Sequence, residues 1–204
     1  MTIGKWENTE FIKPSPSHRG EDSPEAIYVE VGRALGSWEH MESAFARMFQ
    51  VFCESRSLAA CRAYGMIESS FTKHQALRQA TDTFFAKHKP FDTVNSNDTK
   101  AILSAYQSAF QIRNNIAHGI TTGYNLSEDR SHSGYFLCPP SYASKKVKLH
   151  ELSVVYLEGA NYFYTAADLK FYSNRFVDIL NEAVRLAHTV NDNYHVIPPG
   201  ELHP

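Results

Sequence analysis

Cysteine is scarce in this chain of 204 residues, which contains only Cys53, Cys61 and Cys138. Three is an odd number and the spacing matches no metal-ligand pattern, so neither a disulfide framework nor a zinc site is indicated. We expect Cys53 and Cys61 to be small core residues in helices. The pattern therefore predicts no metal and no cofactor.

Long hydrophobic runs are also absent. No stretch approaches the roughly 18 to 20 continuous apolar residues that a membrane span needs, and residues 1–13 lack the charged, then apolar, then small-residue order of a signal peptide. We therefore expect a cytoplasmic protein that makes no contact with membranes.

A large excess of charge of one sign is missing as well. The formal net charge of −2 and the pI of about 6.5 argue against broad coating of nucleic acid, which needs a strong basic field. The charge is uneven, however. Residues 54–118 carry eight Lys or Arg against five Asp or Glu, a local +3, and the remainder carries twelve against seventeen, or −5.

The composition that is present is that of an ordinary globular protein, with 43% hydrophobic, 13% aromatic and 21% charged residues. The length suits one domain. Proline, serine and glycine gather near the start, and proline recurs near the end. We predict an extended or disordered arm at 1–22, a single helical domain at 23–190 and a flexible tail at 191–204.

Apolar residues recur at steps of three and four through most of this domain, the period of a helix with one buried face. The first helix is predicted to start at Ser23 and Pro24, because serine caps free N–H groups and proline suits the first turn. A second helical stretch covers residues 57–88, with a break in its middle. A third begins near Asn97 and stops at Gly119, which we expect to end it in a left-handed conformation.

The pattern changes between residues 120 and 164 to short segments rich in β-branched and aromatic residues, which predict a two- or three-stranded antiparallel insert. Thr165 to Asp168 resembles a capping box that opens a last helix to about Val190. Residues 162–164 are expected to staple the start of this helix into the core. The predicted fold class is mainly α: a bundle of four to five helices with a small antiparallel β insert before the last helix.

The chemically distinctive segment is Arg113-Asn114-Asn115-Ile116-Ala117-His118-Gly119, at the end of the third helical stretch. Asn114 and His118 are four residues apart and share a helix face, and Arg113 lies about 100° to one side, within reach of that face. A planar cation, an amide and an imidazole placed together suit a phosphodiester.

The chemistry that this group suits is RNA cleavage. Histidine can take the proton of a 2′-hydroxyl or supply one to the leaving oxygen, and a guanidinium can hold the phosphoryl oxygens as negative charge builds. No metal is required. The carbonyl end of the helix should also favour the protonated form of His118.

Arg113 to His118 resembles the motif of the HEPN superfamily, an arginine and a histidine separated by four to six residues, with a polar residue after the arginine. The resemblance implies a HEPN-like helical bundle in which the motif ends a late helix. Many members of the superfamily are metal-independent endoribonucleases in toxin–antitoxin, antiviral defence or RNA-processing systems. The motif residues Arg113, Asn114 and His118 would be the catalytic group.

The resemblance also implies partners. A homodimer would bring two motifs into one cleft, RNA or a nucleotide would be the ligand, and an antitoxin or other defence protein could bind the chain. Two features depart from the pattern. Some toxin members have a tyrosine two residues after the histidine, where this chain has Ile120, and the β insert is not required by the superfamily.

Two other functional interpretations stay open. The chain could be a non-catalytic HEPN-like module that binds a nucleotide or a partner, or a purely structural helical protein. The functional and the structural interpretation assign Glu42 different roles. This residue interrupts the apolar stripe of the first helix and needs a partner there. It would either orient Arg113 or His118, or form a buried salt bridge with Arg113. The stripe consists of Ile27, Val31, Leu35, Trp38, Glu42, Phe45, Phe49 and Phe52.

Overall fold

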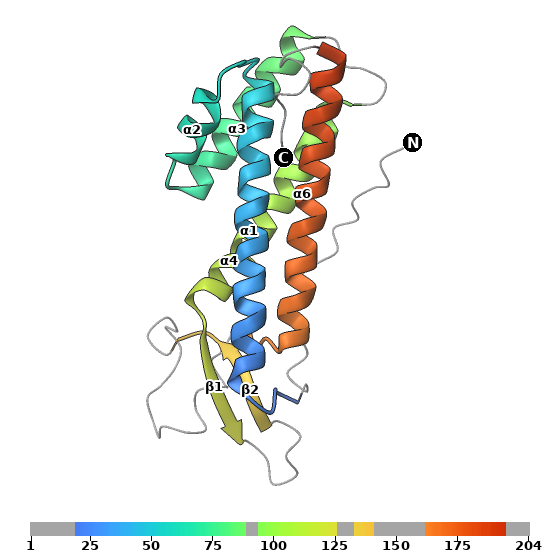
Figure 1. Cartoon of the computed structure of the whole chain (residues 1–204). Helices are drawn as coiled ribbons and strands as arrows, with labels where there is room; N and C mark the ends of the chain where they lie inside the picture. The colour runs from blue at the N-terminus through green and yellow to red at the C-terminus, as the bar shows by residue number, and fades with distance from the viewer. Residues whose placement is uncertain (1–18, 89–93, 126–132, 141–161, 195–204) are drawn as a thin grey trace. The chain divides into compact units, whose positions relative to one another are not determined.

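The structure is a computed structural model that describes residues 19–88, 94–125, 133–140 and 162–194. In these ranges the chain forms five helices and one two-stranded antiparallel sheet (Figure 1). The predicted class is thereby confirmed: the protein is mainly helical, with a small sheet before the last helix. The elements are α1 (Pro24–Phe52), α2 (Ala59–Gly65), α3 (Ser70–Lys87), α4 (Ser96–His118), β1 (Ile120–Asn125), β2 (Ser133–Cys138) and α6 (Ala166–Tyr194).

The chain divides into two compact units, a subdivision that its composition does not reveal. The described residues of the first unit fall within Trp38–Phe110 and Phe176–Pro204, and those of the second within Glu10–Ser37 and Gln111–Arg175. Helices α1, α4 and α6 each contribute one part to each unit.

The core of the first unit is rich in aromatic rings. Trp38 of α1 stacks on Tyr106 of α4 at 5.5 Å between ring centroids and meets Phe176 of α6 edge-on at the same distance. A second cluster joins Phe52 to Phe84 of α3 at 5.2 Å. Such rings bury large apolar areas and favour these offset and edge-on geometries. The stripe predicted for the first helix is confirmed in part: Ile27, Trp38, Phe45 and Phe52 are buried, whereas Val31, Leu35, Glu42 and Phe49 are half-buried at its edge.

The second unit contains the sheet. Strands β1 and β2 pair from Ile120 opposite Cys138 to Asn125 opposite Ser133. Two isolated bridges add to β2: Glu21 pairs with Tyr135, and Tyr164 pairs with Leu137. Any strand between residues 141 and 161 lies outside the described residues, as do residues 1–18 of the predicted arm.

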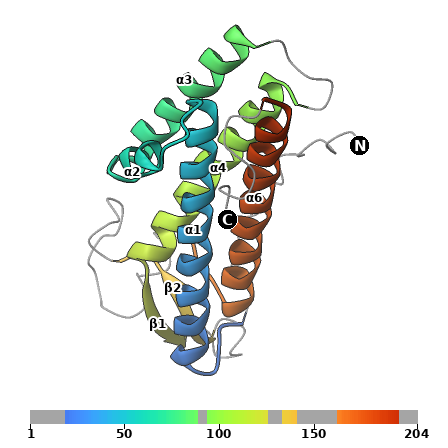
Figure 2. The same ribbon diagram turned by 45° about the horizontal axis from the view of Figure 1, so that its top comes forward.

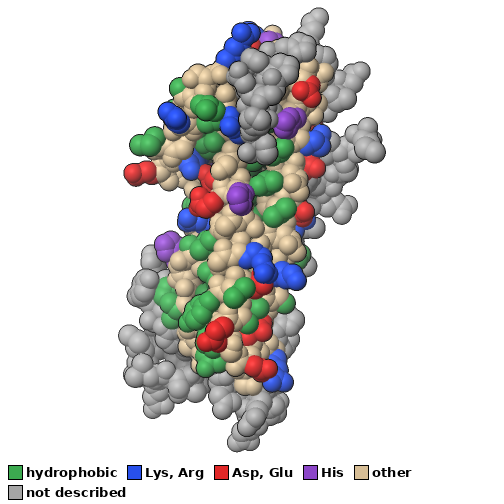
Figure 3. Space-filling model, viewed as in Figure 1, with side chains coloured by type: hydrophobic (Ala, Val, Ile, Leu, Met, Phe, Trp, Pro, Cys, Tyr) green, Lys and Arg blue, Asp and Glu red, His purple; other side chains and the backbone are tan. Residues whose placement is uncertain are grey.

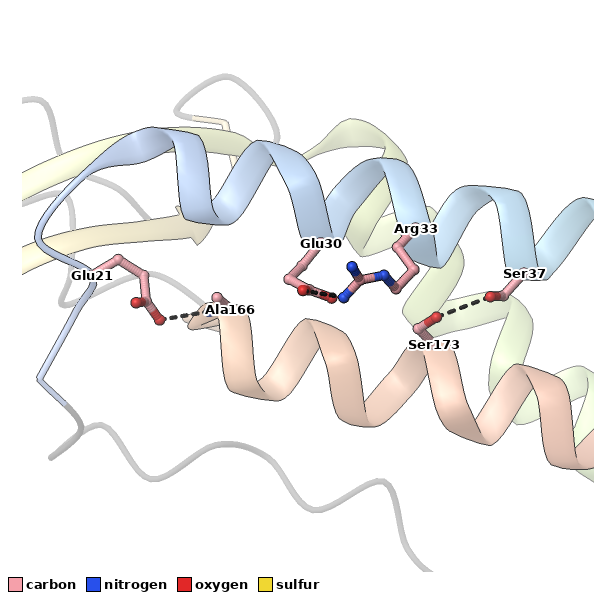
Figure 4. A network of polar contacts seen from close by, with 6 residues as sticks. All are labelled: Glu21, Glu30, Arg33, Ser37, Ala166 and Ser173. Atoms are coloured by element: carbon pink, nitrogen blue, oxygen red, sulfur yellow. Dashed lines mark hydrogen bonds and ion pairs between the residues drawn. The ribbon is translucent and has the colours of Figure 1, made fainter.

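Helix α6 begins as its sequence predicts. Thr165 Oγ1 accepts a hydrogen bond from Asp168 N at 3.2 Å, and Asp168 Oδ2 accepts one from Thr165 N at 2.9 Å, which confirms the capping box. The carboxylate of Glu21 accepts a third, from Ala166 N at 2.9 Å (Figure 4). Residues at the end of the predicted arm therefore hold the start of the last helix.

In the second unit, the first parts of α1 and α6 run side by side in the same direction (Figures 1 and 2). A hydrogen bond of 2.9 Å joins Ser37 Oγ to Ser173 Oγ between them, and Arg33 donates to Glu30 one turn earlier on α1 (Figure 4). At its other end α6 continues to Tyr194 with Asn191 buried, so residues 191–194 are helical and do not belong to a flexible tail. Ala187 and Val190, one turn earlier, are buried and continue the apolar face of α6. This face explains why the helix extends to Tyr194.

The sequence predictions on cysteine, charge and membrane-spanning segments can be compared with the structure. Cys53 is exposed in a turn after α1, which corrects its predicted place in a helical core, whereas Cys61 is half-buried in α2. Side chains of both charges are interspersed over the face drawn in Figure 3. Within the described residues, no helix is long and apolar enough to cross a membrane.

Candidate functional site

The motif occupies the last turn and a half of α4, within the second unit. Ile116, in its middle, is 1% exposed and anchors this end of the helix in the core. When a buried isoleucine fixes the rotation of a helix, the directions of the adjacent side chains are also fixed, because residues three and four apart share a face. Arg113, Asn114 and His118 therefore project from one anchored segment.

Arg113 and Asn114 lie together. Arg113 Nη1 donates to Asn114 Oδ1 at 3.3 Å, a long hydrogen bond, and both side chains are half-buried. A guanidinium has five N–H donors in a planar fork, a geometry that suits an oxyanion. The predicted pairing of the cation with the amide is thus present in the structure.

His118 is the last residue of α4 and is exposed. Within the described part of the chain, its imidazole makes no hydrogen bond or ion pair with Arg113, Asn114 or any other residue. The side chain lies at the carbonyl end of the helix, where partial negative charge accumulates. One chain therefore brings two of the three predicted site residues into contact and presents the third to solvent.

Asn115 bonds to two groups outside the helix. Its Nδ2 donates to Tyr164 Oη at 3.1 Å, and its main-chain oxygen accepts from Tyr162 Oη at 2.9 Å. The sequence predicted the tyrosines as staples of the last helix and overlooked their link to the motif. The only available signal was the aromatic run at residues 162–164, which does not identify a partner 47 positions away.

Gly119 ends α4 differently from the prediction. Its φ is not in the left-handed region, and the described glycine with a positive φ is Gly134, at 121°. A Cβ at Gly119 would lie 2.7 Å from Leu137 Cγ and 2.8 Å from Asn115 O. Glycine is therefore required here because β2 approaches the end of the helix closely.

Glu42 also has other partners than expected. Its carboxylate accepts from Lys73 Nζ at 2.7 Å and from Tyr106 Oη at 2.5 Å, and its side chain is 11% exposed. The nearly buried salt bridge predicted for this residue exists, but a lysine of α3 takes the place of Arg113. Lys73 reaches this carboxylate because α3 packs against α1 in the first unit, where Phe52 also meets Phe84.

The carboxylate of Glu42 affects the pKa of the neighbouring Tyr106. Burial, and then the negative charge of Glu42, raise the pKa of Tyr106 far above its usual value, which favours the protonated hydroxyl that donates to Glu42. Glu42, Lys73 and Tyr106 thus form a polar group that holds α1, α3 and α4 together in the first unit.

Among the described residues, no group of three or more His, Cys, Asp or Glu side chains is placed to hold a metal ion. We compared the chain with models of protein families, with curated proteins and with solved structures, and none of the three comparisons gave a match.

Proposed function

We propose that this protein is a HEPN-like, metal-independent endoribonuclease that acts as a homodimer. His118 serves as acid or base, Arg113 holds the phosphate, and Asn114 positions both groups. The observation that carries the proposal is an exposed imidazole at the end of a helix, five residues after a half-buried arginine–asparagine pair.

The reaction needs no group beyond these side chains and the RNA itself. The 2′-oxygen attacks the adjacent phosphorus, the bond from phosphorus to the 5′-oxygen breaks, and a 2′,3′-cyclic phosphate and a 5′-hydroxyl result. A neutral imidazole accepts the proton of the 2′-hydroxyl, and a protonated imidazole donates one to the departing 5′-oxygen. The guanidinium stabilises the charge on the phosphoryl oxygens.

A second copy of the chain supplies what one copy lacks. This reaction uses a base and an acid, and each motif has one histidine. In the part of the chain that the structure describes, His118 is exposed and makes no hydrogen bond or ion pair with Arg113. Two motifs facing each other across a two-fold axis would place the arginine of one protomer near the histidine of its partner.

The resemblance of the motif also supports a cellular role in defence or in a toxin–antitoxin system. An antitoxin or another defence protein would then control the nuclease by covering the exposed histidine. The near-neutral charge of the chain and the mixed charges in Figure 3 fit an enzyme that contacts a short stretch of RNA.

The alternative is a non-catalytic HEPN-like binding or scaffold module. It is favoured by the contacts of Asn115, which tie the motif into the fold whether or not it reacts. In that case Arg113 and His118 would bind a nucleotide or close a dimer.

End-labelled RNA incubated with the purified protein in EDTA separates the two functions. We expect cleavage to products with a 2′,3′-cyclic phosphate, and a loss of at least a hundredfold in His118→Ala and Arg113→Ala. His40→Ala, which alters an exposed histidine of α1, should cut like wild type. Intact RNA after incubation with a dimeric wild type, or equal cutting by His118→Ala, would exclude the nuclease.

A further inference from the structure

The end of α4 is held by groups from outside the helix. The last four carbonyl groups of any helix lack donors within it, and a left-handed glycine commonly supplies them. Gly119 does not adopt that conformation. The carbonyl of Asn115 instead accepts a hydrogen bond from the Tyr162 hydroxyl at 2.9 Å.

A second contact reaches the same residue. The side chain of Asn115 donates to Tyr164 Oη at 3.1 Å. Main chain and side chain of Asn115 are thus attached to two tyrosines that are themselves two residues apart. An attachment at two points fixes the rotation of the helix end as well as its position.

The two tyrosines form a rigid support. Their rings stack with centroids 4.8 Å apart and planes inclined by 21°, and they are 8% and 2% exposed. Tyr164 N and O each bond to Leu137 of β2 at 2.9 Å. Leu137 is also the side chain that lies against Gly119. The support therefore belongs to the same packed layer that closes on the end of the helix.

His118 lies three residues after Asn115 and is its neighbour on the helix surface. Its exposed side chain makes no hydrogen bond or ion pair with the described residues, so its position depends on the last turn of the helix. We propose that Tyr162 and Tyr164, acting through Asn115, are positioning residues that determine where His118 stands. Their effect on catalysis rests on the proposed function, whereas their effect on His118 does not.

The test compares Tyr162→Phe and Tyr164→Phe, each of which removes one oxygen and keeps the ring. Tyr135→Phe, on β2, is the matched control, since its ring is half-buried and its hydroxyl has no bond to Asn115. The readout is the NMR spectrum of the protein with isotope-labelled histidine, in which the signals lost in His118→Ala identify that ring. Amide hydrogen exchange of Ala117 and His118 is measured in parallel.

We expect the His118 ring signals to shift or broaden in Tyr162→Phe and Tyr164→Phe, with exchange at Ala117 and His118 at least tenfold faster. The control should match wild type. Asn115→Ala removes the same hydrogen bond as Tyr164→Phe and keeps the contact of the carbonyl, so it should match Tyr164→Phe. A folded Tyr162→Phe protein whose His118 signals and exchange equal those of wild type would overturn the proposal.

Activity provides a separate result. If wild type cuts RNA, the two phenylalanine variants should lose about ten- to a hundredfold in kcat, because misplacement of a reacting group affects the transition state. KM should remain unchanged. If wild type does not cut RNA, the proposed function fails, and the NMR comparison still decides whether the tyrosines position His118.

Discussion

At the scale of single residues, Glu42 shows how a polar group inside a helical core is stabilised. Its carboxylate has one partner on each oxygen, Lys73 and Tyr106. Removal of the negative charge would leave the ammonium of Lys73, which is 17% exposed, without its counterion. We predict that Glu42→Gln lowers the free energy of unfolding by about 2 to 4 kcal/mol in urea denaturation.

The neighbouring Glu39 gives the control for this prediction. It is exposed on the same helix, and Glu39→Gln should change the free energy of unfolding by less than about 0.5 kcal/mol. Lys73→Met combined with Glu42→Gln should cost less than the sum of the two single changes. Additive costs, or equal effects at Glu42 and Glu39, would contradict the assigned ion pair.

Glu54, just after α1, makes the protein's stability depend on pH. It adopts a φ of 51°, and its carboxylate bonds to Lys87 at 2.6 Å and to His88 at 2.9 Å. The hydrogen bond from Lys87 is the main cause that holds the pKa of Glu54 below its usual value of 4.5. A lowered pKa in the folded state stabilises the protein above that usual value, and the stabilisation is lost as the pH falls through the lowered pKa.

We therefore predict that Glu54→Gln is less stable than wild type at pH 7, by no more than about 1 kcal/mol because solvent screens the pair. The difference should shrink progressively as the pH falls below 4.5, as measured by urea midpoints at each pH. Glu68→Gln, at an exposed glutamate, should show no such trend. A difference that persists unchanged at pH 3 would refute the ionic origin.

At the scale of elements, the glycines of the helices have opposite roles. A Cβ at Gly119 would meet Leu137 and the carbonyl of Asn115 below 3.0 Å, whereas one at Gly36 would meet nothing within 4 Å. We predict that Gly119→Ala lowers the free energy of unfolding by about 1 to 3 kcal/mol. Gly36→Ala, in the interior of α1, should raise it by about 0.5 to 1 kcal/mol. Thermal unfolding of both variants checks this, and a stabilising Gly119→Ala would show that β2 does not press on α4.

The elements were predictable where the pattern is local. The stripe of α1, the break between α2 and α3 and the capping box of Thr165 and Asp168 all depend on residues a few positions apart. The end of α4 was not predictable, because a glycine is required at position 119 by the close approach of β2. The cap that Glu21 provides for α6 was equally hidden, since its partner is 145 positions away.

In the candidate site, too, the features that depend on nearby residues were predictable and those that depend on distant residues were not. The sequence alone located Arg113, Asn114 and His118 and their shared helix end, and the contact between Arg113 and Asn114 is present. The tyrosines that hold Asn115 and the lysine that pairs with Glu42 come from other elements, and tertiary packing selects them. No local pattern specifies which of several aromatic or cationic residues will meet a given side chain.

At the scale of the whole molecule, the proposed nuclease predicts that one inactive protomer impairs its partner. The reaction uses a base and an acid, and each motif has one histidine. A dimer of one wild-type and one His118→Ala protomer keeps a single imidazole in its cleft and should not cut. We predict that subunit exchange with an equal amount of His118→Ala lowers the RNA cleavage of wild type by about half, assayed with labelled RNA in EDTA. The same mixture before subunit exchange is the control, and cleavage that is unchanged after exchange would contradict a site shared between protomers.

The contacts of Glu21 impose an order on the folding of the chain while it is being synthesised. Residues 20 and 21 bond to β2, and Glu21 bonds to the first residue of α6, so these groups wait until residue 166 has left the ribosome. Helices α1 and α3, in contrast, meet through Phe52 and Phe84 and through Glu42 and Lys73, and can associate early. The last turn of α4 likewise gains its tyrosine supports only when residues 162 and 164 have been made. The contacts that hold the last turn of α4 are thus completed late in translation, after most of the chain has been made.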